Sequence, residues 1–208
     1  MTTGYSDRIN HALAYATKHH DQQVRRGTRS PYLTRHANVA VILTRYDADE
    51  DTVVAGILHD VVGDGLRGGM SREALAGRVG EKFGVDALDL AFAVTERGVD
   101  EEGIEMSADE RRDDLLERLA SAPGGARWVV AADALHEAGT LLAELRRTDF
   151  PETVWARTPR GQGLEWLRRV YDRLKAVSFS APIMKELAEL LEELERHWKA
   201  TQQAGSAL

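Results

Sequence analysis

The chain has 208 residues, enough for one large domain or for one domain with an added helical segment. Hydrophobic residues make up 43% of it, so a real core can form, and the formal net charge of -7 argues against the broad basic surface that nucleic-acid binding requires. The absence of cysteine excludes disulfides, thiolate zinc sites and cysteine nucleophiles.

The sequence shows neither a membrane-spanning segment nor an export signal. No apolar run approaches the roughly 20 residues that span a bilayer. The first residues carry neither the basic nor the apolar segment of a signal peptide. We therefore expect a cytoplasmic protein that has neither a membrane nor a nucleic acid as its partner.

Apolar residues recur at helical spacing in segment after segment of the chain. The predicted helices begin behind Ser6, at the acidic segment 49–51, at a capping box formed by Ser107 and Glu110, at the Pro-Gly-Gly segment 123–125, and near 180–182. No run alternates polar and apolar residues as a strand does. The Gly-rich segment 63–69 is interpreted as a flexible loop. These patterns predict an all-α bundle of roughly eight to ten helices.

Two polar residues, His59 and Asp60, lie near the end of the otherwise apolar run 53–62. A polar pair on a helix that faces a core needs a partner to offset its desolvation, and a divalent metal ion binds both imidazole and carboxylate. Asp133 also lies on an apolar helix, and His36 stands at the start of another. Together, two imidazoles and two carboxylates suit Mn²⁺, Fe²⁺, Co²⁺ or Zn²⁺.

In their order and separation, four segments resemble the HD-domain metal-dependent phosphohydrolases, most closely the branch that hydrolyses guanosine polyphosphate alarmones. The segments are HDQQVRRG (20–27), PYLTRH (31–36), AGILHDVVGD (55–64) and AADALH (131–136). The resemblance implies an HD-type helical bundle over residues 1–150, with additional C-terminal helices over 151–208 packed on the same domain.

The resemblance also implies a chemistry. A metal ion held by His36, His59, Asp60 and Asp133 would lower the pKa of a bound water and polarise a phosphoryl oxygen, and the bond cut would be a nucleotide 3′-pyrophosphate ester. Mn²⁺ is the first expectation, with Fe²⁺, Co²⁺, Zn²⁺ and Mg²⁺ as alternatives. A phosphorylated nucleotide is the expected partner, and a homo-oligomer stays open.

The resemblance assigns further residues to the reaction and to substrate binding. Asp64 would orient or activate the water. Arg25 and Arg26 would contact the nucleotide, and Tyr32 would shape the pocket.

At three positions the chain departs from the family pattern. Gly63 replaces the Glu of a Glu-Asp pair, Glu137 replaces an Asn, and an ungapped alignment puts Arg35, not His36, at the first-ligand position. Because one residue is about 100° of helix rotation, His36 binds a metal only if the preceding turn is rearranged.

The departures keep other interpretations open. The alternative to an enzyme is a degenerate HD module that binds a nucleotide or a partner without catalysis, and a third hypothesis is a structural helical dimer. His36 is equally well a neighbour of the site, and Arg25 and Arg26 are equally well part of a solvated loop. His19, His20 and His136 are interpreted as surface or hydrogen-bonded residues.

Overall fold

The computed structural model describes residues 6–24, 30–158 and 163–205. Within these ranges, all regular secondary structure is helical, and the extended backbone pairs only at two isolated bridges, Val24–Pro31 and Val99–Glu105. The all-α prediction is confirmed. The helices, in chain order, are α1 (Asp7–His19), α2 (Leu33–Arg45), α3 (Glu50–Arg67), α4 (Arg72–Leu75), the π-helical turn η1 (Ala76–Gly80), α5 (Glu81–Phe83), α6 (Val85–Val94), α7 (Ala108–Arg118), α8 (Gly124–Leu145), α9 (Pro151–Arg157), α10 (Leu164–Ala176) and α11 (Ile183–Gly205).

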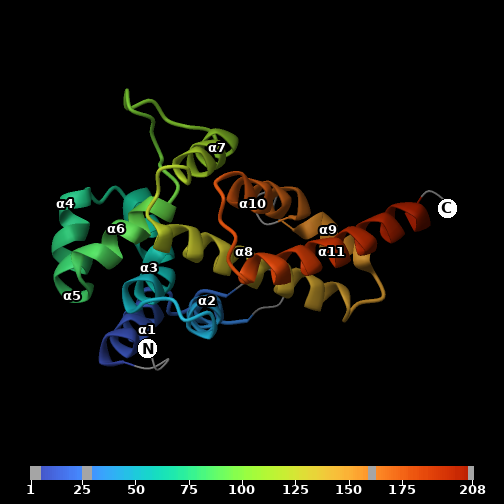
Figure 1. Cartoon of the computed structure of the whole chain (residues 1–208), viewed down its shortest axis with the longest axis horizontal. Coiled ribbons are helices and arrows are strands. Elements are labelled where there is room, and N and C mark those ends of the chain that lie inside the picture. Colours follow the sequence, from blue (N-terminus) through green and yellow to red (C-terminus); the bar gives the residue numbers. More distant parts are fainter. Residues whose placement is uncertain (1–5, 25–29, 159–162, 206–208) are drawn as a thin grey trace.

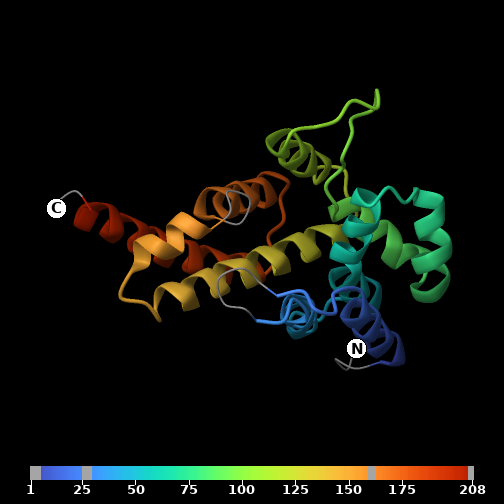
Figure 2. The same ribbon diagram turned by 180° about the vertical axis from the view of Figure 1, so that it is seen from behind.

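The long helix α8 connects the two halves of the molecule (Figures 1 and 2). It packs against α2, α3 and α6 and also against α10 and α11. One continuous cluster of buried residues runs through both halves, from Ile9 on α1 to Leu194 on α11. The helices after residue 150 therefore share the core of the preceding ones, although the predicted boundary at 150 stays a prediction.

Helix starts follow the capping residues that the sequence predicted. The Ser6 hydroxyl accepts a hydrogen bond from the Ile9 backbone N–H at 3.1 Å. Ser107 and Glu110 form the predicted capping box at the start of α7. These bonds satisfy backbone donors that the first helical turn leaves without partners.

The interpretation of segment 63–69 as a loop is wrong for its first part, because α3 continues to Arg67. The glycines there serve close packing. A Cβ on Gly65 would come within 2.9 Å of Leu75 Cδ2 and 3.1 Å of Met70 Cε. In the same way, Gly56 lets α2 approach α3 closely, since a Cβ there would lie 2.5 Å from Leu43 Cδ1.

No helix among the described residues combines the length and the apolar character that a membrane span needs.

Candidate functional site

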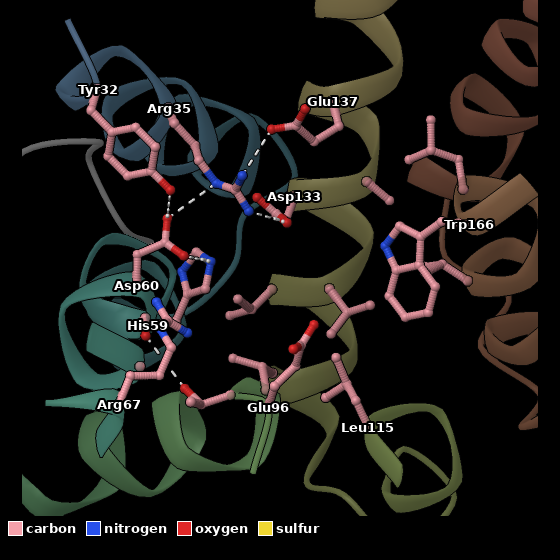
Figure 3. A pocket seen from close by; sticks show the side chains of 18 residues that line it. Tyr32, Arg35, His59, Asp60, Arg67, Glu96, Leu115, Asp133, Glu137 and Trp166 are labelled. Carbon is pink, nitrogen blue, oxygen red and sulfur yellow. Dashed lines mark hydrogen bonds and ion pairs between the residues drawn. The ribbon is translucent and has the colours of Figure 1, made fainter. Parts of the chain in front are cut away.

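A cavity of about 220 Å³ lies where α2, α3, α8 and α10 meet (Figure 3). Its polar wall carries side chains of three motif segments, 31–36, 55–64 and 131–136, and its apolar wall comes mainly from α7, α8 and α10. The residues that line it are Tyr32, Arg35, His59, Asp60, Gly63, Arg67, Val94, Thr95, Glu96, Leu115, Val129, Val130, Asp133, Ala134, Glu137, Trp166, Leu167 and Val170. Of the residues that the sequence predicts for the site, this cavity brings together His59, Asp60, Asp133 and Tyr32.

His59 and Asp60 enter the cavity from α3. His59 Nδ1 lies 2.9 Å from the carbonyl oxygen of Gly56, one turn earlier, so this nitrogen donates its proton to that oxygen. Nε2 lies 3.5 Å from Asp60 Oδ1. The Tyr32 hydroxyl donates to Asp60 Oδ2 at 3.2 Å. The helix backbone and α2 thus fix the orientation of both side chains.

Arg35 reaches from α2 into the space between α3 and α8, and its guanidinium meets three carboxylates (Figure 3). Its Nε lies 3.2 Å from Asp60 Oδ2, its Nη2 lies 2.7 Å from Asp133 Oδ2 and its Nη1 lies 2.9 Å from Glu137 Oε1. Asp133 and Glu137 are one turn apart on α8, so one planar cation connects three helices.

The electrostatics of this cluster keep its charges in place. Burial would lower the pKa of Arg35, but Asp133, Asp60 and Glu137 outweigh it and raise that pKa well above its usual value. Burial would likewise raise the pKa of Asp60, and the Arg35 guanidinium instead lowers it. Arg35 and Asp60 are therefore a buried ion pair throughout the physiological pH range.

The four predicted metal ligands fit a metal ion in chemistry but not in this arrangement. His59 Nε2 faces the carboxylate of Asp60, and Asp133 Oδ1 is buried without a hydrogen-bond partner in the described part of the chain. The place between Asp60 and Asp133, however, is held by the guanidinium of Arg35. A divalent ion there would lie directly against the positive charge of Arg35, so we derive no reaction step through it.

His36 lies behind the cavity instead of lining it. The ring is fully buried and stacks on His20, with ring centroids 4.7 Å apart. Neither nitrogen has a hydrogen-bond partner among the described residues. Burial is the main cause that lowers its pKa to about 3, so the ring is neutral. The structure thus brings Arg35, and not His36, between the two aspartates.

Asp64, the predicted water-orienting residue, is not among the side chains that line the cavity. Its carboxylate forms an ion pair with Arg67 and lies 3.4 Å from His19 Nε2 and 3.7 Å from His20 Nδ1. His19, His20 and Asp64 are the one group of His, Asp or Glu side chains in the described residues whose ligand atoms lie close enough together for a metal ion.

Sequence reasoning missed several of these residues. His20 is hydrogen-bonded to Gln23, as one of its two interpretations has it, but its burial beside His36, at 1% side-chain exposure, was not foreseen. Glu96 and Trp166 line the cavity from segments that carry no motif. The adjacent His19-His20 pair at the end of a predicted helix was a usable signal, whereas Trp166 offered none. The predicted Arg25 and Arg26 lie outside the described residues.

Comparisons with known proteins agree with the resemblance seen in the sequence. A family model described as HD domain matches residues 12–123. A GTP pyrophosphokinase of Myxococcus xanthus is 26% identical over 170 residues, which are 78% of this chain and 21% of that protein. A guanosine-3′,5′-bis(diphosphate) 3′-pyrophosphohydrolase of Aquifex aeolicus is 29% identical over 94 residues, 45% of this chain and 12% of that protein. The chain thus spans a small part of the length of these curated relatives.

Solved structures are similar over most of the chain. A metazoan orthologue of SpoT that hydrolyses ppGpp is 26% identical with a TM-score of 0.67, and the match covers 91% of this chain and 96% of that one. The protein lmo0812 of Listeria monocytogenes is 25% identical with a TM-score of 0.60, and the match covers 77% of this chain and 97% of that one. The predicted resemblance to HD-domain alarmone hydrolases is confirmed.

Proposed function

Because the chain belongs to the HD domain family, we propose that it is a phosphohydrolase that removes the 3′-pyrophosphate group of a guanosine polyphosphate. The observation that carries the proposal is the cavity itself, which joins the two family segments around His59-Asp60 and Asp133 in one polar wall. The similarity to a ppGpp hydrolase over nine-tenths of the chain supports the choice of substrate.

The shape of the cavity suits a nucleotide whose two ends differ in polarity. Trp166, Leu167 and Leu115 form an apolar wall, on which a purine ring can stack. The phosphate end would then face the polar wall with Tyr32 and Arg67. We propose Arg25 and Arg26 as further phosphate contacts, as the sequence resemblance implies.

Charge in the cavity indicates that a cation accompanies the substrate. Four carboxylates (Asp60, Glu96, Asp133 and Glu137) line it against two arginines (Arg35 and Arg67). A free polyphosphate meets a net negative field there, which costs binding energy. We propose Mn²⁺ as the ion, since the His and Asp side chains at hand supply the nitrogen and oxygen ligands that it accepts. Asp64 remains our candidate for the residue that orients the attacking water.

The proposal is tested by product analysis. Purified protein with saturating MnCl2 is incubated with a panel of nucleoside polyphosphates, and products are separated by ion-exchange chromatography. We expect guanosine tetraphosphate to yield guanosine diphosphate and pyrophosphate, and we expect Asp133→Asn to lose most of this activity. If folded protein hydrolyses no member of the panel, the proposal is wrong.

A second function is favoured by one specific observation. The ion pairs of Arg35 with Asp60, Asp133 and Glu137 hold together a site that would bind a nucleotide without cleaving it. In that case equilibrium dialysis would show guanosine tetraphosphate bound and recovered intact. The double substitution Arg35→His with Gly63→Glu would then produce a large gain of hydrolysis. A Cβ on Gly63 would lie 3.3 Å from Arg67 Nη1 and 3.4 Å from Thr95 Cγ2, so the exposed Arg67 side chain must shift to admit the Glu.

A further inference from the structure

We propose that a divalent transition-metal ion binds at His19, His20 and Asp64, instead of between Asp60 and Asp133, and that its binding releases Arg67 to hold a substrate phosphate. The cation site stands by itself, while the role of Arg67 rests on the proposed function. The site lies one helical turn beyond Asp60 on α3, where α3 passes the end of α1.

The three donor atoms already have nearly the spacing of ligands around one ion. Asp64 Oδ2 lies 3.4 Å from His19 Nε2 and 3.7 Å from His20 Nδ1, and the ligand atoms of the group all lie within 4.8 Å of one another. Metal–nitrogen and metal–oxygen bonds of roughly 2.0–2.2 Å place tetrahedral ligands about 3.4 Å apart. Side-chain adjustments of about an ångström therefore close the site.

The end of α1 explains how two adjacent histidines face one point. Side chains of consecutive residues on a regular helix project about 100° apart. His19 is the last residue of α1, and His20 is the C-cap, where the backbone has left the helix at φ -101° and ψ 19°. The two rings consequently meet at 4.8 Å between centroids. His20 is packed between His36 and Tyr32, which holds its ring in position.

The charged neighbours of the two places favour ion binding at His19, His20 and Asp64 over binding between Asp60 and Asp133. Those two aspartates share a buried guanidinium, whose removal from its carboxylates would be costly. The partner of Asp64 is Arg67, whose side chain is 60% exposed. An exposed ion pair contributes little to stability, so a divalent ion can replace Arg67 at Asp64 at small cost.

Binding of an ion at His20 requires that His20 Nδ1 gives up its hydrogen bond to Gln23. The Oε1 atom of Gln23 lies 3.0 Å from His20 Nδ1, which in the metal-free protein donates its proton to that oxygen. Ion binding at Nδ1 shifts the proton to Nε2, a buried atom with no hydrogen-bond partner in the described residues in either state. The amide oxygen of Gln23 is then free to serve as the fourth ligand of the ion.

Release of Arg67 links the ion to the cavity. Arg67 lines the cavity that also holds His59 and Asp60, whereas Asp64 does not. When the ion takes the carboxylate of Asp64, the guanidinium of Arg67 loses its partner and remains beside the phosphate end of the cavity. A guanidinium without a carboxylate partner binds phosphate with two parallel hydrogen bonds. Ion and nucleotide would therefore bind cooperatively.

The cation site is tested with MnCl2 alone, by electron paramagnetic resonance of free Mn²⁺ during titration of the full chain. We expect one equivalent to bind, and His19→Ala and Asp64→Asn to weaken it by about tenfold or more, at least the loss that removal of an outer-shell partner causes. His197→Ala, a histidine on α11, and Asp133→Asn should leave it unchanged. No binding, or binding lost in Asp133→Asn and kept in His19→Ala, would overturn the proposal.

The release of Arg67 is tested by a double-mutant cycle on the affinity for guanosine tetraphosphate. MnCl2 is held at the concentration that saturates the wild type, and rapid filtration separates bound from free nucleotide before turnover. His19→Ala and Arg67→Ala should each weaken binding, and the double variant should lose no more than either one. Additive losses would contradict the coupling. If the wild type binds no nucleotide, the coupling falls with the proposed function, and the Mn²⁺ titration still decides the cation site.

Discussion

Arg35 determines more of this site's chemistry than any other single residue. Its guanidinium lies where the sequence resemblance implies a metal ion, and it gives Asp60, Asp133 and Glu137 a common counter-charge. Its planar fork suits three carboxylates on two helices in a way that a lysine ammonium would not. The consequence is a polar wall that is assembled without an ion.

Loss of the guanidinium should therefore destabilise the fold. Arg35→Met leaves three carboxylates without their cation, and breaking a buried ion pair in this way costs about 3–5 kcal/mol. We expect MnCl2 to recover part of the loss, because the vacated place would then accept a divalent ion. Urea unfolding measures both effects. Arg45→Met is the control, since its pair with Glu186 is exposed and its removal should change little. Equal losses in the two variants would contradict this account.

His36 makes the stability depend on pH in a defined direction. Its pKa is about 3 in the folded chain and about 6.5 when unfolded, so between these values only the unfolded chain binds the proton. The free energy of unfolding should therefore fall as the pH drops below about 6.5, by up to about 1.4 kcal/mol per pH unit from this group. Urea unfolding from pH 7 to pH 4.5 should show a shallower slope for His36→Leu. An unchanged slope would refute the assignment.

At the scale of helices, Gly56 controls how closely α2 approaches α3, and so where Arg35 reaches. A Cβ at Gly56 would lie 2.5 Å from Leu43 Cδ1 and 3.1 Å from Val39 Cγ1, both fully buried. Gly56→Ala should therefore destabilise by about 1–3 kcal/mol. Gly77→Ala, where a Cβ meets nothing within 4 Å, should not. Chemical denaturation compares the two, and a neutral Gly56→Ala would show that the helices separate freely.

Local chemistry made much of the helical architecture predictable. Ser6, and the Ser107–Glu110 capping box, start helices by hydrogen bonds within a few residues, which a sequence shows directly. The helix was predicted to end before segment 63–69 because glycine in a sequence has two possible meanings. It marks a flexible turn or a close contact, and here the contact of Gly65 with Leu75 decides, which only the folded chain reveals.

Spacing along one helix is visible in a sequence, whereas contacts between separate elements are not, and the predicted site stays a prediction. His59, Asp60 and Asp133 were placed together because their helices carry apolar faces toward one core. The choice between Arg35 and His36 depends on one residue of helix rotation, and His36 turns toward His20. The His19–Asp64 contact arises from the crossing of α1 and α3, which spacing alone does not define.

At the scale of the whole molecule, the cavity is completed by a helix from the C-terminal part of the chain. Trp166 on α10 faces the polar wall across the cavity (Figure 3). If it stacks on the guanine base, Trp166→Ala should weaken guanosine tetraphosphate binding by about tenfold, since base–aromatic stacking contributes about 1–3 kcal/mol. Isothermal titration measures this. Trp198→Ala, on α11 and outside the cavity, is the control. Equal affinities in both variants would exclude the stacking.

The central claim is that Arg35 holds the place between the two aspartates while the cation binds elsewhere. Anomalous X-ray scattering from a crystal soaked in MnCl2 locates the ion directly. The account predicts a peak among His19, His20 and Asp64, with the Arg35 guanidinium still between Asp60 and Asp133. A peak between those two aspartates, with Arg35 displaced, would contradict it.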